Sequence, residues 1–454
     1  MTIWPRKPLL TLATLAALAA APHSVPGLER WQGIGRNALA QVLEFTPRSA
    51  SLAPVDDQRA IIEPAAGAVA DDLIHDPAHA LDSFYASLLR TERNEPGAVT
   101  RILHYGDSPA TADLITADLR QLLQTRFGDA GHGLHLLARP WAWYGHRGVE
   151  VSAEGWEMAV VTQRRAADGW YGVAGVSFTG QTGARSRFKL RSARHTRLVV
   201  HYAGGPEGGR LVVRGSENEL GLIDTQMPAP ASARGSVSLP PGLQEVELRV
   251  TRGTVRLFAV SFETPGPGVI YDSLGLNGVS AAALVYFMNE AHWAGQLRAA
   301  QPSLVILNYG TNESGFDKYV DGSYREDLRK ALRRIRRALP GTPLLVMSPM
   351  DRGVREATDA IGTIPALPRL VNIQREVAIE EGCAFFNTFA AMGGKGTMGK
   401  WYLSEPRLVS ADFIHPLPAG GKIVANLLER AMMRGYNHYK LRLLRAPQFA
   451  EARP

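Results

Sequence analysis

A chain of 454 residues, of which 45% are hydrophobic and 20% are charged, is globular and long enough for more than one hydrophobic core, so we expect two folded units. The single cysteine, Cys383, excludes an intramolecular disulfide, and its apolar surroundings in the sequence predict a core residue. The net charge of +7 favours an anionic polymer or a membrane surface as partner. No nucleic-acid motif accompanies this charge, so we expect no nucleic-acid partner.

Residues 1–24 have the pattern of an export signal. Arg6 and Lys7 precede an apolar run from Leu9 to Ala21, which is too short to be a comfortable membrane span. We therefore expect a periplasmic or secreted protein. Pro22 directly follows the run and opposes cleavage there, so the segment is either a signal peptide or an uncleaved N-terminal anchor that associates the protein with the membrane.

Residues 25–96 are rich in Ala, Pro and polar residues, which predicts a linker followed by a helix over about 78–90. His75 and His79 have the i, i+4 spacing of a metal site. Pro77 lies between them and no further ligand with usable spacing is near, so we expect no metal there. We expect no metal or other cofactor elsewhere in the chain.

The stretch 102–110 predicts a strand, a tight turn and a helix, because an apolar run ends at Gly106 and a helical pattern begins at Ala110. Such a turn places Ser108 at the carboxyl end of a strand, while the first N–H groups of the helix point at whatever Ser108 attacks. This geometry suits a nucleophile. Alternatively, Asp107 and Ser108 only cap the helix, since Asp and Ser are common cap residues.

Several residues that follow this helix are candidates for substrate contacts. Trp141, Trp143, Tyr144 and His146 either stack on sugar rings or are buried at a domain junction. His132, in a Gly-rich loop, either reaches the active site or is a structural loop histidine.

Short alternating runs replace the helical periodicity in residues 140–267. In one of them Val246, Leu248 and Val250 share a face, and turns rich in Gly and Pro separate the runs. This pattern predicts a β-sandwich of the jelly-roll type, inserted between two parts of another domain. We place those parts at residues 97–139 and 268–454.

Strands and helices alternate again after the insert. Apolar runs at 304–307 and 344–347 are followed by helical patterns, the last over about 420–434. This alternation predicts a parallel sheet with helices on both faces, in three α/β/α layers. The site of such a sheet lies at the carboxyl ends of its strands, where Ser108 and Asn312 both fall.

Four short motifs along the chain occur in the order typical of one enzyme family. Gly106–Ser108 reads Gly-Asp-Ser, Gly278 precedes Val-Ser, Gly310–Glu313 reads Gly-Thr-Asn-Glu, and Asp412–His415 reads Asp-Phe-Ile-His. Together they resemble the ordered blocks of the SGNH (GDSL-type) esterases. The resemblance extends from about residue 100 to the last helix and implies a flavodoxin-like fold.

The resemblance also implies roles for these residues in acyl transfer. Ser108 would be the nucleophile, His415 the general base and then the general acid, and Asp412 the carboxylate that orients the imidazole. The backbone N–H groups of Ser108 and Gly278 and the side-chain amide of Asn312 would stabilise the oxyanion.

Two positions near the glycine and asparagine motifs leave alternatives open. Gly275 is the second candidate for the glycine role, although Gly278 fits the family's block better. The family commonly has Asp after the motif asparagine, whereas this chain has Glu313, whose role the resemblance does not define.

Within the family, the Gly-Thr-Asn-Glu motif and the β insert resemble exported bacterial peptidoglycan O-acetylesterases, whose inserted module is similar to carbohydrate-binding modules. The resemblance implies removal of the acetyl group from the 6-hydroxyl of N-acetylmuramic acid. We therefore predict a serine esterase acting on an O-acetylated polysaccharide, with peptidoglycan favoured. The alternatives are an esterase or acyltransferase for another acylated glycan or a lipid, and a polysaccharide-binding protein without activity.

Overall fold

The computed structural model describes residues 74–445, apart from Glu217 and Thr358. The predicted export signal and most of the predicted linker lie outside the described residues. The chain divides into two units at residue 433, and the description below concerns residues 74–432, together with the continuation of the last helix to Arg445. Among the described helices, none combines the length and the apolar character needed to cross a membrane.

A six-stranded sheet carries the motifs singled out in the sequence. Its strands lie in the order β1 (Ile74–His75), β17 (Ala384–Phe386), β14 (Leu344–Met347), β13 (Leu304–Asn308), β2 (Val99–Gly106) and β12 (Gly268–Gly275). The last five are parallel, and in chain order they follow the 2-1-3-4-5 arrangement of flavodoxin-like folds. The two-residue β1 pairs antiparallel with β17, so the sheet is mixed and the expectation of a purely parallel sheet is corrected.

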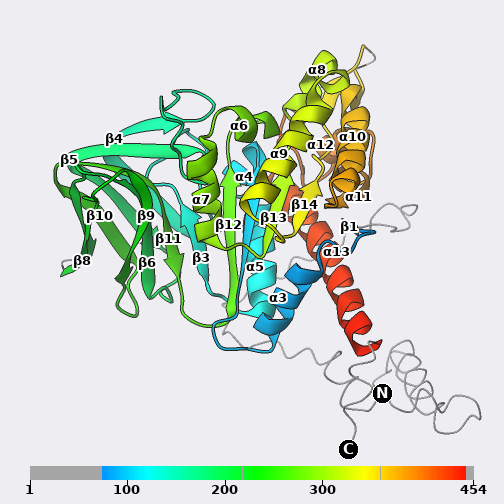
Figure 1. Cartoon of the computed structure of the whole chain (residues 1–454). Coiled ribbons are helices and arrows are strands. Elements are labelled where there is room, and N and C mark those ends of the chain that lie inside the picture. Colours follow the sequence, from blue (N-terminus) through cyan, green and yellow to red (C-terminus); the bar gives the residue numbers. More distant parts are fainter. Residues whose placement is uncertain (1–73, 217, 358, 446–454) are drawn as a thin grey trace, which may run out of the picture. The chain divides into compact units, whose positions relative to one another are not determined.

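Helices cover this sheet on both faces, since every residue of β12, β13 and β14 is buried. The helices near β2 and β12 are α3 (Asp82–Glu92), α4 (Ser108–Thr111) and α5 (Thr116–Phe127). The helix α9 (Tyr324–Ala338) packs against α6 (Ala281–Tyr286), α7 (Glu290–Ala300), α8 (Asp317–Asp321) and α10 (Ala366–Glu380) (Figure 1). The remaining helices are α11 (Thr388–Ala391), α12 (Thr397–Leu403) and α13 (Pro418–Arg445).

A second sheet, in which all pairings are antiparallel, contains nine strands. They are β3 (Gly131–His135), β4 (Val149–Val160), β5 (Val176–Leu190), β6 (Arg197–Gly204), β7 (Arg210–Gly215), β8 (Asn218–Asp224), β9 (Ala231–Ser238), β10 (Glu245–Arg252) and β11 (Thr254–Glu263). The path of paired strands runs β8-β7-β10-β5-β11-β6-β9, with β3 beside β11 and β4 beside β5.

This antiparallel sheet curls until the two ends of its strand order meet. A side chain added at Gly221 of β8 would touch Val237 of β9, and one added at Gly235 of β9 would touch Ile223 of β8. The side chains enclosed include the fully buried Phe188. Since hydrogen bonds link all nine strands into one sheet, the division into a jelly-roll sandwich stays a prediction.

A buried ionic network joins the two sheets. Arg101 of β2 pairs with Asp272 of β12 at 2.8 Å and with Glu263 of β11. The other oxygen of the Asp272 carboxylate accepts a hydrogen bond from the backbone N–H of Leu134 in β3, at 2.8 Å. Because removing one partner would leave a buried charge unpaired, this network fixes how the antiparallel sheet continues from the flavodoxin-like sheet.

Candidate active site

Ser108 lies where the sequence predicts it, just beyond the end of β2 at the first position of α4. Gly106 permits this sharp change of direction, because a side chain there would come within 2.8 Å of the Ala110 side chain. Ser108 is buried, with 7% of its surface exposed, but its hydroxyl meets a group from the far end of the chain.

The Ser108 hydroxyl, the His415 ring and the Asp412 carboxylate form a continuous chain of hydrogen bonds. Ser108 Oγ lies 2.7 Å from His415 Nε2, and His415 Nδ1 lies 2.6 Å from Asp412 Oδ2. The structure thus brings together the three residues that the motifs singled out, although 307 positions separate Ser108 from His415. A hydroxyl, an imidazole and a carboxylate in this order can transfer the hydroxyl proton to the imidazole while a carbonyl is attacked.

The short loop around Asp412 is fixed by its own hydrogen bonds. Asp412 Oδ1 accepts the backbone N–H groups of Ile414 at 2.9 Å and His415 at 3.1 Å, together with the Ser410 hydroxyl. Between them, Phe413 adopts a φ of 61°, a strained value for an aromatic residue. This strain is held in place because the Phe413 carbonyl accepts the Gly353 N–H at 2.9 Å.

The same contacts keep Asp412 ionised. Burial raises the pKa of Asp412, but hydrogen bonds from Ser410, the His415 ring and the backbone outweigh that effect and lower the pKa to about 2. The carboxylate is therefore charged at any pH at which the enzyme would work. It can hold the Nδ1 proton of His415 and leave Nε2 free to accept the proton of Ser108.

Asn312 and Gly278 lie on loops that follow β13 and β12, the two strands on either side of β2. The Asn312 side-chain amide donates to the Val279 carbonyl at 2.9 Å, which fixes its direction and leaves its second N–H available. Gly278 has a φ of 68°, and no atom lies within 4 Å of the place a side chain would occupy. The space beside Gly278 is thus open to a ligand.

The structure separates the two candidates for the glycine role. A side chain at Gly275 would lie 2.0 Å from the backbone nitrogen of Thr111, so this glycine is required for packing between β12 and α4. Gly278 instead is required for its left-handed backbone and faces open space. The geometry therefore favours Gly278 over Gly275 as a donor to a bound ligand.

Glu313, the residue that departs from the family's usual Asp, connects the two loops. Its carboxylate accepts the Gly310 N–H at 3.1 Å and the Ala281 N–H at 3.2 Å, which ties the Asn312 loop to the loop that follows Gly278. Burial raises the pKa of Glu313 to about 7, and the negative charge of Asp107 adds to the increase. Sequence reasoning left this role open because it depends on a contact 32 residues away.

We expect replacement of Glu313 by glutamine to flatten the pH dependence of thermal stability. A carboxyl group whose pKa is raised on folding stabilises the protein below its unfolded pKa, and that contribution is lost as the pH rises through the folded pKa. Between about pH 4.5 and 7 the wild-type melting temperature should therefore fall by roughly 5 °C more than that of Glu313→Gln. Calorimetry of both proteins across this range measures the difference in slope, and parallel curves would contradict the assignment.

The residues predicted to contact substrate lie in different environments. Trp143 is 56% exposed, and its indole N–H donates to the Asn277 side chain at 3.3 Å, next to Gly278. Tyr144 is buried and its hydroxyl accepts the Leu136 N–H, which agrees with the alternative of a buried aromatic and not with a sugar contact. Trp141 is partly buried against the core, with its indole N–H enclosed.

His132 is also turned toward the protein. One of its ring nitrogens lies 2.6 Å from the Arg147 carbonyl and the other lies 2.8 Å from the His135 ring. Both nitrogens therefore face protein groups, which agrees with the alternative of a structural histidine and not with a substrate contact. Of the predicted contact residues, Trp143 is the one that lies exposed beside the candidate site.

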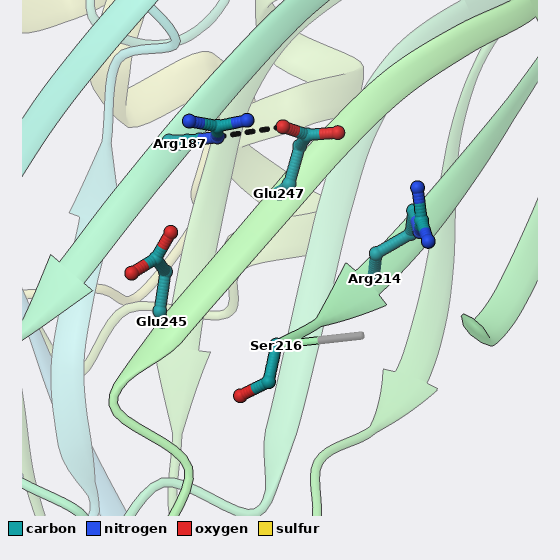
Figure 2. Close-up of a pocket in the computed structure, with 5 residues that line it drawn as sticks. All are labelled: Arg187, Arg214, Ser216, Glu245 and Glu247. Atoms are coloured by element: carbon teal, nitrogen blue, oxygen red, sulfur yellow. Dashed lines mark hydrogen bonds and ion pairs between the residues drawn. The ribbon is translucent and has the colours of Figure 1, made fainter. Parts of the chain in front are cut away.

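The antiparallel sheet carries a separate polar groove of about 540 Å³ (Figure 2). Its lining consists of Arg187, Arg214, Ser216, Glu245 and Glu247, and Arg187 is paired with Glu247 at 2.7 Å. None of the predicted catalytic residues lines this groove. It has no aromatic platform and no arrangement of nucleophile and base.

We expect Asn312→Ala to reduce the turnover number for an ester about 10²–10³-fold, because one preorganised oxyanion donor is lost. The melting temperature should change little, since the side chain makes a single hydrogen bond to Val279. Steady-state kinetics with p-nitrophenyl acetate measure the effect, and Asn426→Ala on α13 is the matched control. A loss below tenfold would show that Asn312 is not a donor in the transition state.

The serine, histidine and aspartate chain, at the carboxyl edge of a flavodoxin-like sheet, is the arrangement of the serine hydrolases. Comparison with known families agrees, because residues 248–423 match the model of the GDSL-like lipase/acylhydrolase family. Residues 248–423 thus resemble a hydrolase domain of the GDSL (SGNH) type, and the site has the arrangement of a carboxylic ester hydrolase. The match begins within β10 and therefore does not include Ser108. In the sequence, the strands β3 to β9 lie between Ser108 and the start of the match.

Solved structures with a similar fold include one described as a peptidoglycan O-acetylesterase in action. It is 20% identical, with a TM-score of 0.70, and the likeness covers 81% of this chain and 100% of that chain. A salicylyl-acyltransferase from a tetracycline biosynthetic pathway is 17% identical over 63% of this chain and 96% of its own, with a TM-score of 0.29. No curated protein matches the sequence.

Proposed function

We propose that this protein is an exported serine esterase that removes O-acetyl groups from a polysaccharide, with peptidoglycan as the preferred substrate. The observation that carries the proposal is the chain of hydrogen bonds from Ser108 to His415 and Asp412, at 2.7 and 2.6 Å, beside the open space at Gly278. A fold shared with a peptidoglycan O-acetylesterase along the whole of that chain supports the choice of substrate.

The first half of the reaction transfers the acetyl group to the enzyme. Ser108 Oγ attacks the acetyl carbonyl carbon while His415 Nε2 takes the hydroxyl proton. The N–H groups of Ser108 and Gly278 and the amide of Asn312 stabilise the oxyanion. When the tetrahedral intermediate collapses, the bond to the sugar oxygen breaks and His415 returns the proton to that oxygen, which leaves an acetyl ester on Ser108.

The second half releases the acetyl group by the same route. A water molecule gives a proton to His415 as it attacks the acetyl-serine, and the same donors stabilise the second oxyanion. Collapse of this intermediate frees acetate and returns the proton to Ser108 Oγ. No group other than these side chains and water is needed to balance the reaction.

Trp143 supports a sugar rather than a lipid as the carrier of the acetyl group. Its large, exposed ring lies beside the Gly278 segment, and an exposed aromatic face is the usual platform for a sugar ring. The indole is fixed by its hydrogen bond to Asn277, so it is preorganised for stacking. A Trp143→Ala variant should raise the KM for a polymeric substrate and leave that for p-nitrophenyl acetate unchanged.

The experiment that tests the proposal compares acetate release from O-acetylated peptidoglycan with release from acetylated xylan. We expect faster release from peptidoglycan by the wild-type protein and none above background by Ser108→Ala. Faster release from xylan would assign the enzyme to plant polysaccharides. Equal rates for wild type and Ser108→Ala would contradict an esterase altogether. Fractionation of cells expressing the full chain tests export.

A further inference from the structure

Three histidines meet at the junction between the two sheets, and none of them takes part in the proposed reaction. His132 and His135 belong to β3, and His146 lies shortly before β4. One ring nitrogen from each lies within 4.8 Å of the other two. We propose that these three histidines bind a divalent transition-metal ion of the Zn²⁺ type.

The hydrogen bonds of His132 direct a lone pair into the cluster. His132 Nε2 lies 2.6 Å from the Arg147 carbonyl, which can only accept, so Nε2 must carry the proton. Nδ1 of a neutral His132 is then unprotonated and faces His135 Nε2 at 2.8 Å. A ring that donates one N–H to a carbonyl and presents its other nitrogen inward is the usual arrangement of a histidine that ligates a metal.

His146 supplies an independent observation. It is more than nine-tenths buried, and its Nδ1 has no hydrogen-bond partner among the described residues. Its ring centroid lies 4.6 Å from that of His135. A buried polar atom without a partner costs free energy, and a metal ion shared with the neighbouring rings would satisfy it.

A fourth histidine borders the cluster. His195 is buried, both of its ring nitrogens lack a partner within the described part of the chain, and its ring centroid is 6.4 Å from that of His132. Three imidazoles with a fourth position for water or another nitrogen are a common ligand set for zinc.

The charges that face the cluster do not exclude a cation. The positive charge of Arg120 acts on the cluster, but Asp113 is paired with Arg120 at 2.6 Å and acts on His146 with the opposite sign. His135 and His146 are buried, and the three ring nitrogens lie close enough together to share one ion. The ligand set and its charge suit an ion that prefers imidazole nitrogen.

Backbone geometry explains why the sequence did not reveal this cluster. Residues three apart in a regular strand point to opposite faces, so His132 and His135 would be expected to diverge. Gly133 between them has a φ of 86°, and the strand register shifts beside Gly131. The two rings therefore face each other, with centroids 4.6 Å apart.

An ion at this position would stabilise the segment that carries Trp143. After Trp143, the Gly145 N–H donates to the Thr111 carbonyl at 3.3 Å and the Arg147 N–H donates to Asp113 at 2.9 Å. His146 lies between these two anchors. The ion would thus hold the segment against the chain that follows Ser108, and its role would be structural rather than chemical.

The test uses the full chain, without a histidine tag, after dialysis against a chelator. Titration with Co²⁺ should give the visible absorption of a four-coordinate, nitrogen-ligated ion at one equivalent, and Zn²⁺ should displace it and raise the melting temperature. His146→Asn should bind neither ion, whereas the matched control His79→Asn, at an exposed histidine outside the cluster, should bind both.

Folded wild-type protein that takes up neither ion would overturn the proposal, as would unchanged binding by His146→Asn. Cadmium NMR of the wild-type protein provides a measurement that does not depend on a variant folding. Coupling of the cadmium resonance to the ring nitrogens of labelled histidine supports the site, and absence of that coupling in the bound protein contradicts it. These readouts do not involve esterase activity, so the proposed function and the metal site are tested separately.

Discussion

Ser108→Ala is expected to lower ester hydrolysis by about 10⁴–10⁶-fold, because no other described side chain pairs a hydroxyl with the His415 ring. The variant should fold normally, since it removes one oxygen and leaves β2 and α4 unchanged. The loss should lie in the turnover number rather than in KM. Steady-state kinetics with p-nitrophenyl acetate measure it.

The matched control is Ser238→Ala, at an exposed serine on β9 of the antiparallel sheet. It should retain wild-type activity. Rapid quenching of the wild-type reaction followed by mass spectrometry should place an acetyl group on the peptide that contains Ser108, and the same peptide of Ser108→Ala should remain unmodified. Substantial residual activity in Ser108→Ala, with acetyl on another residue, would show that the nucleophile lies elsewhere.

The sequence predicted the parts of the fold that depend on local patterns. Continuous apolar runs at 304–307 and 344–347 became β13 and β14, which are buried on both faces as such runs require. Asp412 and His415 could be paired through the resemblance to the family's motif, whose three-residue spacing allows one short loop to hold both. The antiparallel edge strand β1 has only two residues and no periodicity, so nothing in the sequence could reveal it.

The features that the sequence did not predict arise from contacts between distant segments. Glu313 acquires its role because Ala281 comes within 3.2 Å of its carboxylate. Tyr144 is as aromatic as Trp143, but a hydrogen bond from Leu136 holds it in the core. The left-handed backbone at Gly133 turns His132 toward His135. In each case residue type indicates what a side chain can do, and tertiary packing decides what it faces.

Asp412→Asn is the second substitution for which we expect a large effect, a loss of about 10³–10⁴-fold in turnover. The carboxylate holds a proton on His415 Nδ1, whereas an amide can turn its own N–H toward that nitrogen and favour the tautomer with the proton on Nε2. His415 could then not accept the proton of Ser108.

Thermal stability distinguishes this effect from loss of the loop. The pKa of Asp412 is about 2, so wild-type activity at mildly acidic pH should not be limited by protonation of this carboxylate. The amide introduced by Asp412→Asn would keep a side-chain oxygen that accepts the Ile414 and His415 N–H groups, so the melting temperature should change only slightly. The control is Asp359→Asn, at an exposed aspartate whose φ of 61° asparagine also tolerates. A variant that lost activity only in proportion to its stability, or by less than tenfold, would indicate that Asp412 maintains the loop and does not select the tautomer.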